Sequence, residues 1–119
     1  WCGVSAAGKP VFALPGNPVS TLVCLVRLAL PALESAMGLA DSRQPRVLLG
    51  ETIEFRPDLA WFLPVKLAWT AAGTCVAEPR PTNTSGDFIG LRDTDGFVEL
   101  PRGSERFAAG TPVRFFSWQ

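Results

Sequence analysis

The sequence predicts an α+β chain, in which a strand-turn-helix piece of an α/β domain is followed by a small, mostly antiparallel β-barrel domain. Two patterns predict this division. Residues 11–33 combine an apolar run with helical periodicity, whereas the apolar residues after position 46 alternate with a period of two. Between these patterns, the short polar stretch 41–45 ends in proline and is typical of a linker. We therefore predict an α/β segment over 1–40, a linker over 41–45 and a barrel over 46–119.

The first segment is predicted to contain a strand and two turns. Residues 11–14 are four consecutive apolar residues bounded by turn-forming residues, which predicts a fully buried strand. Residues 8–10, Gly-Lys-Pro, predict a hairpin turn before this strand. Residues 15–20, Pro-Gly-Asn-Pro-Val-Ser, predict the turn that leads from the strand into a helix.

The helix is predicted to begin at Pro18, which suits a first helical turn, with Asn17 as its N-cap and Gly38 at its end. Pro31 interrupts the span, so we predict a kink or a break near residues 27–31. The apolar stripe consists of Val19, Leu22, Val23, Val26, Leu30, Leu33 and Met37. Because the opposite face is also apolar, we expect a buried helix that needs cover on two sides.

The second segment is predicted to form five or so short strands in about 75 residues, which is typical of a small barrel or sandwich. The expected strands are 47–49, which leads to 53–55, and then 63–69, 74–78, 97–100 and 113–118. Turns are expected at Ala72-Gly73, Asp95-Gly96, Arg102-Gly103 and Ala109-Gly110. The residues expected to pack in the core or at the barrel ends are Trp61, Trp69, Phe115, Phe116 and Trp118.

Composition excludes several classes of function. Eleven basic and eleven acidic residues leave no net charge, which argues against nucleic acid as a partner. Three separated cysteines and no histidine argue against structural zinc and a disulfide framework, and favour a cytoplasmic protein. The most apolar stretch, 18–33, is shorter than the roughly 20 residues that span a bilayer, so no membrane is expected. The chain begins at Trp1 without a signal-like segment, and we expect it to be a piece of a longer protein.

Two regions of the chain resemble one known family. Residues 8–20, GKPVFALPGNPVS, resemble the last strand-turn-helix of the molybdopterin-binding domain in MoeA-type molybdopterin molybdenumtransferases, a family that includes the gephyrin E domain. Motifs similar to those of this family's C-terminal β-barrel domain follow in the same order. They are Leu63-Pro64-Val65, Ala77-Glu78-Pro79, Ser85-Gly86-Asp87, Thr94-Asp95-Gly96-Phe97, Leu100-Pro101 and Gly110-Thr111-Pro112-Val113. LPGNPVS is a specific signature, whereas the barrel motifs carry weight only as a series.

The resemblance implies an enzyme of molybdenum cofactor biosynthesis that inserts molybdate into adenylated molybdopterin and releases AMP, with help from a divalent cation such as Mg²⁺. It also implies a homodimer in which the active site is shared between subunits. None of the residues matches the family's catalytic acids, and none is expected to bind the metal. The resemblance therefore implies that the longer parent is active, and that this chain alone supplies only part of the substrate cleft.

The binding residues that we expect lie in two places. At the turn, the backbone N–H groups of Gly16 and Asn17 meet the positive end of a helix, which favours an oxyanion. Pro15 and Pro18 hold the turn rigid, and the Ser20 hydroxyl adds a donor. In the barrel, a polar turn with Ser85 and Gly86 and the nearby Arg80 are expected to face the same cleft. The full set is Pro15, Gly16, Asn17, Pro18, Ser20, Arg80, Ser85 and Gly86.

Two other interpretations stay open. Gephyrin-like relatives hold a receptor peptide with the same region, so a peptide-binding module is one alternative, and an exposed aromatic side chain near a barrel edge would favour it. The other alternative is a module that only packs and dimerises. Asp93 and Asp95 resemble a catalytic carboxylate pair, but Asp95-Gly96 is a strong hairpin signal and we interpret both residues as structural.

Overall fold

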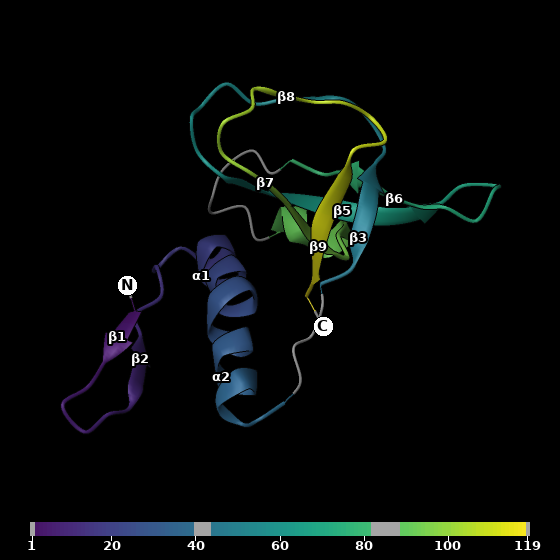
Figure 1. Cartoon of the computed structure of the whole chain (residues 1–119). Helices are drawn as coiled ribbons and strands as arrows, with labels where there is room; N and C mark the ends of the chain where they lie inside the picture. The colour runs from purple at the N-terminus through teal and green to yellow at the C-terminus, as the bar shows by residue number, and fades with distance from the viewer. Residues whose placement is uncertain (1, 40–43, 82–88, 119) are drawn as a thin grey trace. The chain divides into compact units, whose positions relative to one another are not determined.

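The computed structural model describes residues 2–39, 44–81 and 89–118, and the chain divides into two compact units. Unit 1 is Trp1–Ser42 and unit 2 is Arg43–Gln119 (Figure 1). This division falls within the stretch 41–45 that was predicted as a linker.

Unit 1 begins with a β-hairpin. Strand β1 (Cys2–Val4) pairs antiparallel with β2 (Pro10–Phe12), and the intervening turn contains Gly8 at φ +73°. The hairpin turn predicted at residues 8–10 is therefore confirmed. The prediction of a fully buried strand at 11–14 is wrong, because the strand ends at Phe12 and most of its residues are exposed. Within the described part of unit 1, β2 pairs with β1 alone, so its faces lack the layers that would bury it.

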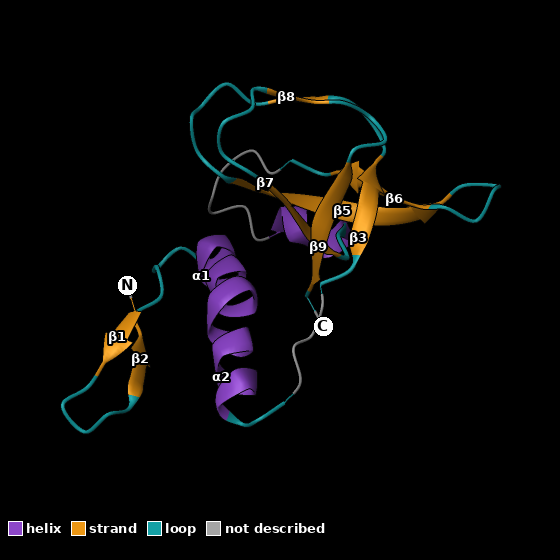
Figure 2. Ribbon diagram, in the orientation of Figure 1, coloured by secondary structure: helices purple, strands orange, loops and turns teal. Residues whose placement is uncertain are grey.

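The helical part of unit 1 consists of α1 (Pro18–Cys24), the π-helical turn η1 (Leu25–Ala29) and α2 (Leu30–Ala36). Figure 2 labels α1 and α2. In η1 the Leu30 N–H donates to the Leu25 carbonyl, five residues back. Pro31 explains this geometry, because its ring has no N–H to donate and crowds the carbonyl of Arg27 in a regular α-helix. The predicted disturbance near 27–31 is thus present as a widened turn rather than as a break.

The helix ends where the sequence predicted. Gly38 has φ +73°, and its N–H donates to the Ser35 carbonyl over 3.1 Å. The Leu39 N–H donates to the Glu34 carbonyl over 2.9 Å. This pair of hydrogen bonds is the Schellman motif, in which a left-handed glycine satisfies the last carbonyl groups of a helix.

The prediction that this helix is buried is wrong for unit 1. Only Val19, Val23 and Ala29 of its residues are buried, whereas Leu33 and Met37 of the apolar stripe are exposed. The unit supplies one small hairpin as possible cover, which is too little for a helix that is apolar nearly all round. The 19-residue span Pro18–Ala36 is also long and apolar enough to cross a membrane, so the length argument against a membrane does not hold. Core helices of soluble proteins meet the same criterion.

Unit 2 is a closed five-stranded barrel with the strand order β3-β6-β5-β7-β9 (Figures 1 and 2). Four of its strand pairs are antiparallel, and β3 with β6 is parallel, which confirms the predicted mostly antiparallel barrel. The strands are β3 (Arg46–Leu49), β5 (Trp61–Trp69), β6 (Cys75–Pro79), β7 (Gly96–Leu100) and β9 (Pro112–Ser117). A separate two-stranded sheet pairs β4 (Ile53–Glu54) with β8 (Arg106–Phe107), and a 3₁₀ turn, η2, covers Ile89–Asp93. Strand β8 has only two residues, too few to show an alternating pattern.

The barrel interior is filled by alternate residues of its strands. Leu63 and Val65 of β5, Ala77 of β6 and Val98 of β7 are completely buried in one core cluster. A second apolar layer lies on Phe97, which points to the opposite face of β7 from Val98. The Phe97 ring lies 4.9 Å from Phe116, 5.1 Å from Trp118 and 5.7 Å from Phe62, measured between ring centroids. Of the aromatic residues expected to pack, Trp69 does not, since it is 73% exposed.

Gly96 is a strand residue and not part of a hairpin turn, so the prediction for Asp95-Gly96 is wrong. Gly96 pairs with Val65 on β5 and with Ser117 on β9. A Cβ atom at Gly96 would lie 2.0 Å from the Phe116 carbonyl oxygen and 2.7 Å from the Phe115 ring. The glycine therefore permits a close approach of two strands, which is the other common reason for glycine at such a place.

Candidate functional site

The turn before α1 is closed by Asn17, as predicted. Asn17 has extended backbone angles, φ −75° and ψ 126°, and its Oδ1 accepts a hydrogen bond from the Ser20 N–H over 3.1 Å. Its carbonyl accepts the first helical hydrogen bond, from the Thr21 N–H over 2.8 Å. Pro18 occupies the first helical turn, where a missing N–H has no consequence. The residue pattern of this turn therefore determines where the helix starts.

Thr21 is a residue of this turn that sequence reasoning missed. Its hydroxyl lies within hydrogen-bonding reach of the Pro15 carbonyl and of the Asn17 carbonyl, the latter at 2.8 Å. A threonine hydroxyl that bonds back to a carbonyl four residues earlier is a known local pattern, and it was the available signal in the sequence. The Asn17 side chain thus binds the first helical turn, and the Thr21 side chain binds the residues before it.

The turn presents backbone donors that the described residues leave without a partner. These donors are the N–H groups of Gly16, Asn17 and Val19, and they lie at the positive end of the helix dipole. Gly16 has no positive φ, and a Cβ atom built on it would meet nothing within 4 Å. The open space beside Gly16 therefore allows an oxyanion to approach the backbone closely.

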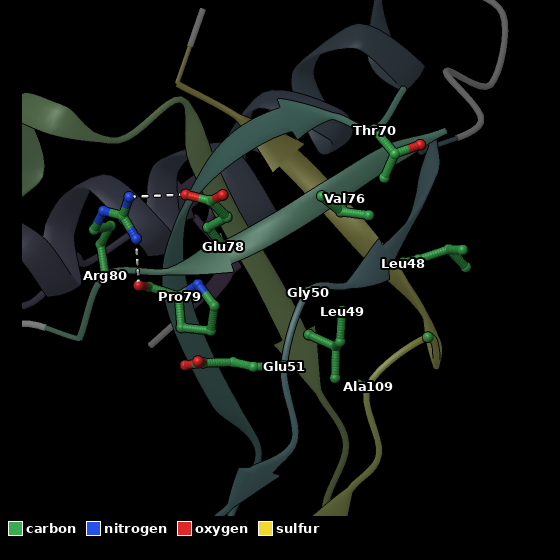
Figure 3. A pocket seen from close by; sticks show the side chains of 11 residues that line it. Leu48, Leu49, Gly50, Glu51, Thr70, Val76, Glu78, Pro79, Arg80 and Ala109 are labelled. Carbon is green, nitrogen blue, oxygen red and sulfur yellow. Dashed lines mark hydrogen bonds and ion pairs between the residues drawn. The ribbon is translucent and has the colours of Figure 1, made fainter. Parts of the chain in front are cut away.

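Arg80 lies in unit 2, at one side of a surface groove of about 560 Å³ over the parallel pair β3 and β6 (Figure 3). Its Nη2 forms an ion pair with Glu78 Oε2 at 2.9 Å, and its Nη1 donates to the Pro79 carbonyl over 3.0 Å. The two contacts hold the guanidinium beside the groove with 39% of the side chain exposed. The groove is lined by Leu48, Leu49, Gly50, Glu51, Thr70, Val76, Glu78, Pro79, Arg80, Ala109 and Gly110.

The predicted site residues therefore fall into three groups. Pro15, Gly16, Asn17, Pro18 and Ser20 share one turn in unit 1. Arg80 lies in the groove of unit 2. Ser85 and Gly86 lie outside the described residues.

Two ion pairs on unit 2 shift the pKa values of their partners, and both are exposed. The hydrogen bond from Lys66, and then its charge, lower the pKa of Asp93, while the same contact raises the pKa of Lys66. Arg102 likewise lowers the pKa of Asp58 by a hydrogen bond. Asp95, the other member of the carboxylate pair, accepts the Leu67 N–H over 2.7 Å through its Oδ2. Asp93 and Asp95 thus tie β5 to the loop before β7, in agreement with a structural role.

The described residues contain no group of three or more His, Cys, Asp or Glu side chains placed to hold a metal ion.

The closed barrel, together with the hairpin and helix that precede it in the chain, defines the class of the chain as α+β. Residues 46–118 match the family described as MoeA C-terminal region (domain IV). Since this match covers more than half of the sequence, the chain belongs to the MoeA family. The resemblance seen in the sequence is confirmed, and so is the α+β fold with its barrel.

Individual relatives agree with this assignment. The molybdopterin molybdenumtransferase of Synechocystis sp. is 42% identical over 117 residues, which is 98% of this chain and 27% of the relative. Molybdopterin molybdenumtransferase 2 of Mycobacterium tuberculosis is 32% identical over 91% of the chain and 26% of the relative. The crystal structure of a MoeA protein of molybdopterin biosynthesis from Pyrococcus horikoshii superposes with a TM-score of 0.70 at 32% identity, covering 99% of this chain and 28% of that one. The chain thus spans about a quarter of the length of the relatives it matches.

Proposed function

We propose that this chain is the C-terminal part of a molybdopterin molybdenumtransferase, an enzyme that inserts molybdate into adenylated molybdopterin and releases AMP. The observation that carries the proposal is the 42% identity with the Synechocystis enzyme over 98% of the chain. The match includes both the turn at the start of α1 and the barrel. In this proposal the chain contributes part of the substrate cleft, and the catalytic acids belong to the rest of the parent enzyme.

The turn at residues 15–20 binds a phosphate or molybdate oxyanion in this proposal. Unpartnered N–H groups at Gly16, Asn17 and Val19 support the assignment, since they donate hydrogen bonds without adding a charge that would need neutralising. The hydrogen bonds of Asn17 and Thr21 keep these donors in place before the ligand arrives. Ser20 adds a hydroxyl in the first helical turn.

Arg80 acts as a second anion-binding group in this proposal, together with Ser85 and Gly86. Glu78 and the Pro79 carbonyl orient its guanidinium, which leaves further N–H donors for a ligand. The Glu78 carboxylate also offsets the positive charge of Arg80. Arg80 therefore contributes more to the orientation of a bound anion than to its electrostatic attraction. Mg²⁺, the homodimer and the cytoplasmic location are expectations for the parent enzyme that follow from the family resemblance.

The test is a calorimetric titration of the full-length parent with molybdopterin-AMP, using variants of the turn. Gly16→Ala fills the open space beside the backbone without straining it, so its effect reports on ligand approach. Asn17→Asp keeps a capping oxygen and adds a negative charge at the oxyanion position. We expect each variant to weaken binding at least tenfold, about 1.4 kcal/mol.

The matched control is Asn17→Ser, which keeps the cap and adds no charge. It should bind within about threefold of the wild type, roughly 0.6 kcal/mol. Wild-type affinity and wild-type molybdenum insertion in both Gly16→Ala and Asn17→Asp would contradict the proposed role of the turn.

One observation favours a second function, that of a peptide-binding module. Trp69 ends strand β5 beside the β5–β6 turn and is 73% exposed, which is the exposed aromatic side chain near a barrel edge that this alternative requires. A panel of peptides tested for binding to the chain, with Trp69→Ala as the variant, distinguishes the two functions. Peptide binding that Trp69→Ala abolishes would support the module, whereas no binding by the wild type would argue against it.

A further inference from the structure

Three charged side chains form a row across the outer surface of the barrel. Glu99 of β7 lies directly opposite Arg114 of β9, and Arg114 lies directly opposite Arg46 of β3. Residues paired in this way on neighbouring antiparallel strands point to the same face, so the three side chains are neighbours. Val47 and Val113, the next pair along β3 and β9, are buried on the inner face. The row therefore lies on the outer face.

The charges in this row do not balance. One carboxylate faces two guanidinium groups, and Arg114 Nη1 reaches Glu99 Oε2 only at 4.0 Å. Arg46 has no ion-pair partner among the described residues and lies beside a second cation. Like charges directly opposite each other on adjacent strands are destabilising. An anion between the two guanidinium groups would remove this repulsion.

The row also lines a cavity. A surface groove of about 390 Å³ is bounded by all three charged residues, and it shares no lining residue with the Arg80 groove. The remaining lining is largely apolar and is formed by Pro101, Phe107, Thr111, Pro112 and Val113. The volume lies at the lower end of the range for small-ligand sites, roughly 300–1,000 Å³. An apolar surface beside convergent charged groups is the usual composition of such sites.

We propose that this groove is a binding site for a small oxyanion, a carboxylate or phosphate group, held between the guanidinium groups of Arg46 and Arg114. Guanidinium is planar and presents its N–H donors in a fork that matches two oxygens of such a group. Glu99 competes with the ligand for Arg114 and sets the affinity. An apolar body attached to the anion rests on Phe107 and Pro112. The site is independent of the function proposed above.

The experiment follows the side-chain Nε–Hε resonances of the arginines by NMR in the 119-residue chain, at constant ionic strength. Inorganic phosphate, acetate and phenylacetate are the probes, and chloride is the reference anion. We expect saturable shifts at Arg46 and Arg114 that are absent at Arg102, which is paired with Asp58. Tighter binding of phenylacetate than of acetate identifies an organic acid that uses the apolar floor, whereas tightest binding of phosphate identifies the free inorganic anion.

Three variants test whether the anion binds in this groove. Arg46→Gln should weaken binding at least fivefold, and Glu99→Gln should strengthen it by removing the competing carboxylate. Arg56→Gln removes an exposed positive charge that lies outside the groove and should leave affinity unchanged. The proposal is overturned if shifts are linear with concentration for all anions, or if Arg46→Gln and Arg56→Gln bind alike.

Discussion

The two units of the chain use their apolar residues in opposite ways. Among the described residues, unit 2 contains fourteen of the seventeen buried hydrophobic side chains, whereas unit 1 contains eight of the eleven large exposed ones. The barrel closes on itself, so its strands bury their inner faces against one another and leave no free edge. A helix and a two-stranded hairpin cannot do this. The difference shows that apolar periodicity marks a face that needs cover without indicating where that cover comes from.

The largest expected effect compares one glycine from each unit. Gly96→Ala places a Cβ atom 2.0 Å from a backbone oxygen, so strands β7 and β9 must separate. We expect a loss of more than about 4 kcal/mol in the free energy of unfolding, measured by urea denaturation. Gly16→Ala meets nothing within 4 Å and should change stability by less than about 0.5 kcal/mol. A Gly96→Ala chain as stable as the wild type would show that the strands are less closely packed.

A second comparison uses leucines. Leu63 is completely buried in the barrel, and Leu63→Ala should cost about 2–5 kcal/mol because it leaves a cavity. Leu33 is 44% exposed on α2, and Leu33→Ala should cost less than about 1 kcal/mol because alanine favours helix. Equal losses of unfolding free energy in a chain shown to be monomeric would mean that Leu33 is buried in solution.

Limited proteolysis sharpens the comparison without mutation. The trypsin site at Arg27 lies in unit 1, and those at Lys66 and Arg114 lie on barrel strands. Local opening costs less where few apolar contacts are broken, so we expect cleavage in unit 1 at least tenfold faster, about 1.4 kcal/mol in opening free energy. Mass spectrometry of the time course measures the order. Equal rates in a verified monomer would contradict the division of stability between units.

A smaller effect concerns the helix start. Asn17→Ala removes the acceptor of the Ser20 N–H and should destabilise the helix by about 1 kcal/mol, since a capping side chain is lost. Amide hydrogen exchange at Ser20 and Thr21 should accelerate, while exchange in β7 stays constant. The control is Asn17→Ser, in which exchange at Ser20 should stay close to wild type; acceleration in the serine variant as well would remove the capping explanation.

The smallest effect is the pH dependence of the Lys66–Asp93 ion pair. Lys66 lowers the pKa of Asp93 in the folded state, so the stabilisation is present above the ordinary pKa of aspartate, about 3.9, and is lost as the pH falls through the lower folded value. Because both groups are exposed, the melting temperatures of wild type and Asp93→Asn should differ only slightly at pH 7. The difference should shrink as the pH falls below about 3.9. A difference that grows on acidification would assign the pair an unfavourable role.

Local sequence patterns predicted the local structure well. The cap at Asn17, the end of the helix at Gly38 and the disturbance before Pro31 each depend on the conformational limits of one residue type. Period-two alternation likewise located five barrel strands to within about two residues at each end. The candidate turn was predicted for the same reason, whereas the Thr21 hydroxyl contact was missed because threonine has several possible partners.

The errors concern contacts between distant segments. Asp95-Gly96 has the residues of a hairpin turn. Position 96 must be glycine for another reason, because the Phe116 carbonyl, twenty residues later in the chain, leaves no room for a Cβ atom there. Trp69 alternates correctly with the core residues of β5, yet it is the last residue of this strand and is exposed. The pairing of Arg46 with Arg114 depends on the register of β3 and β9, which no local pattern encodes.

The sequence by itself determined the strand-turn-helix, its caps, the barrel strands and the family, because each follows from short-range geometry or from a continuous motif. Only the tertiary structure decided which apolar faces are covered, why position 96 must be glycine, and which charged side chains share a groove. These features arise when the barrel closes, since closure sets the strand register and brings together residues that are far apart in the chain.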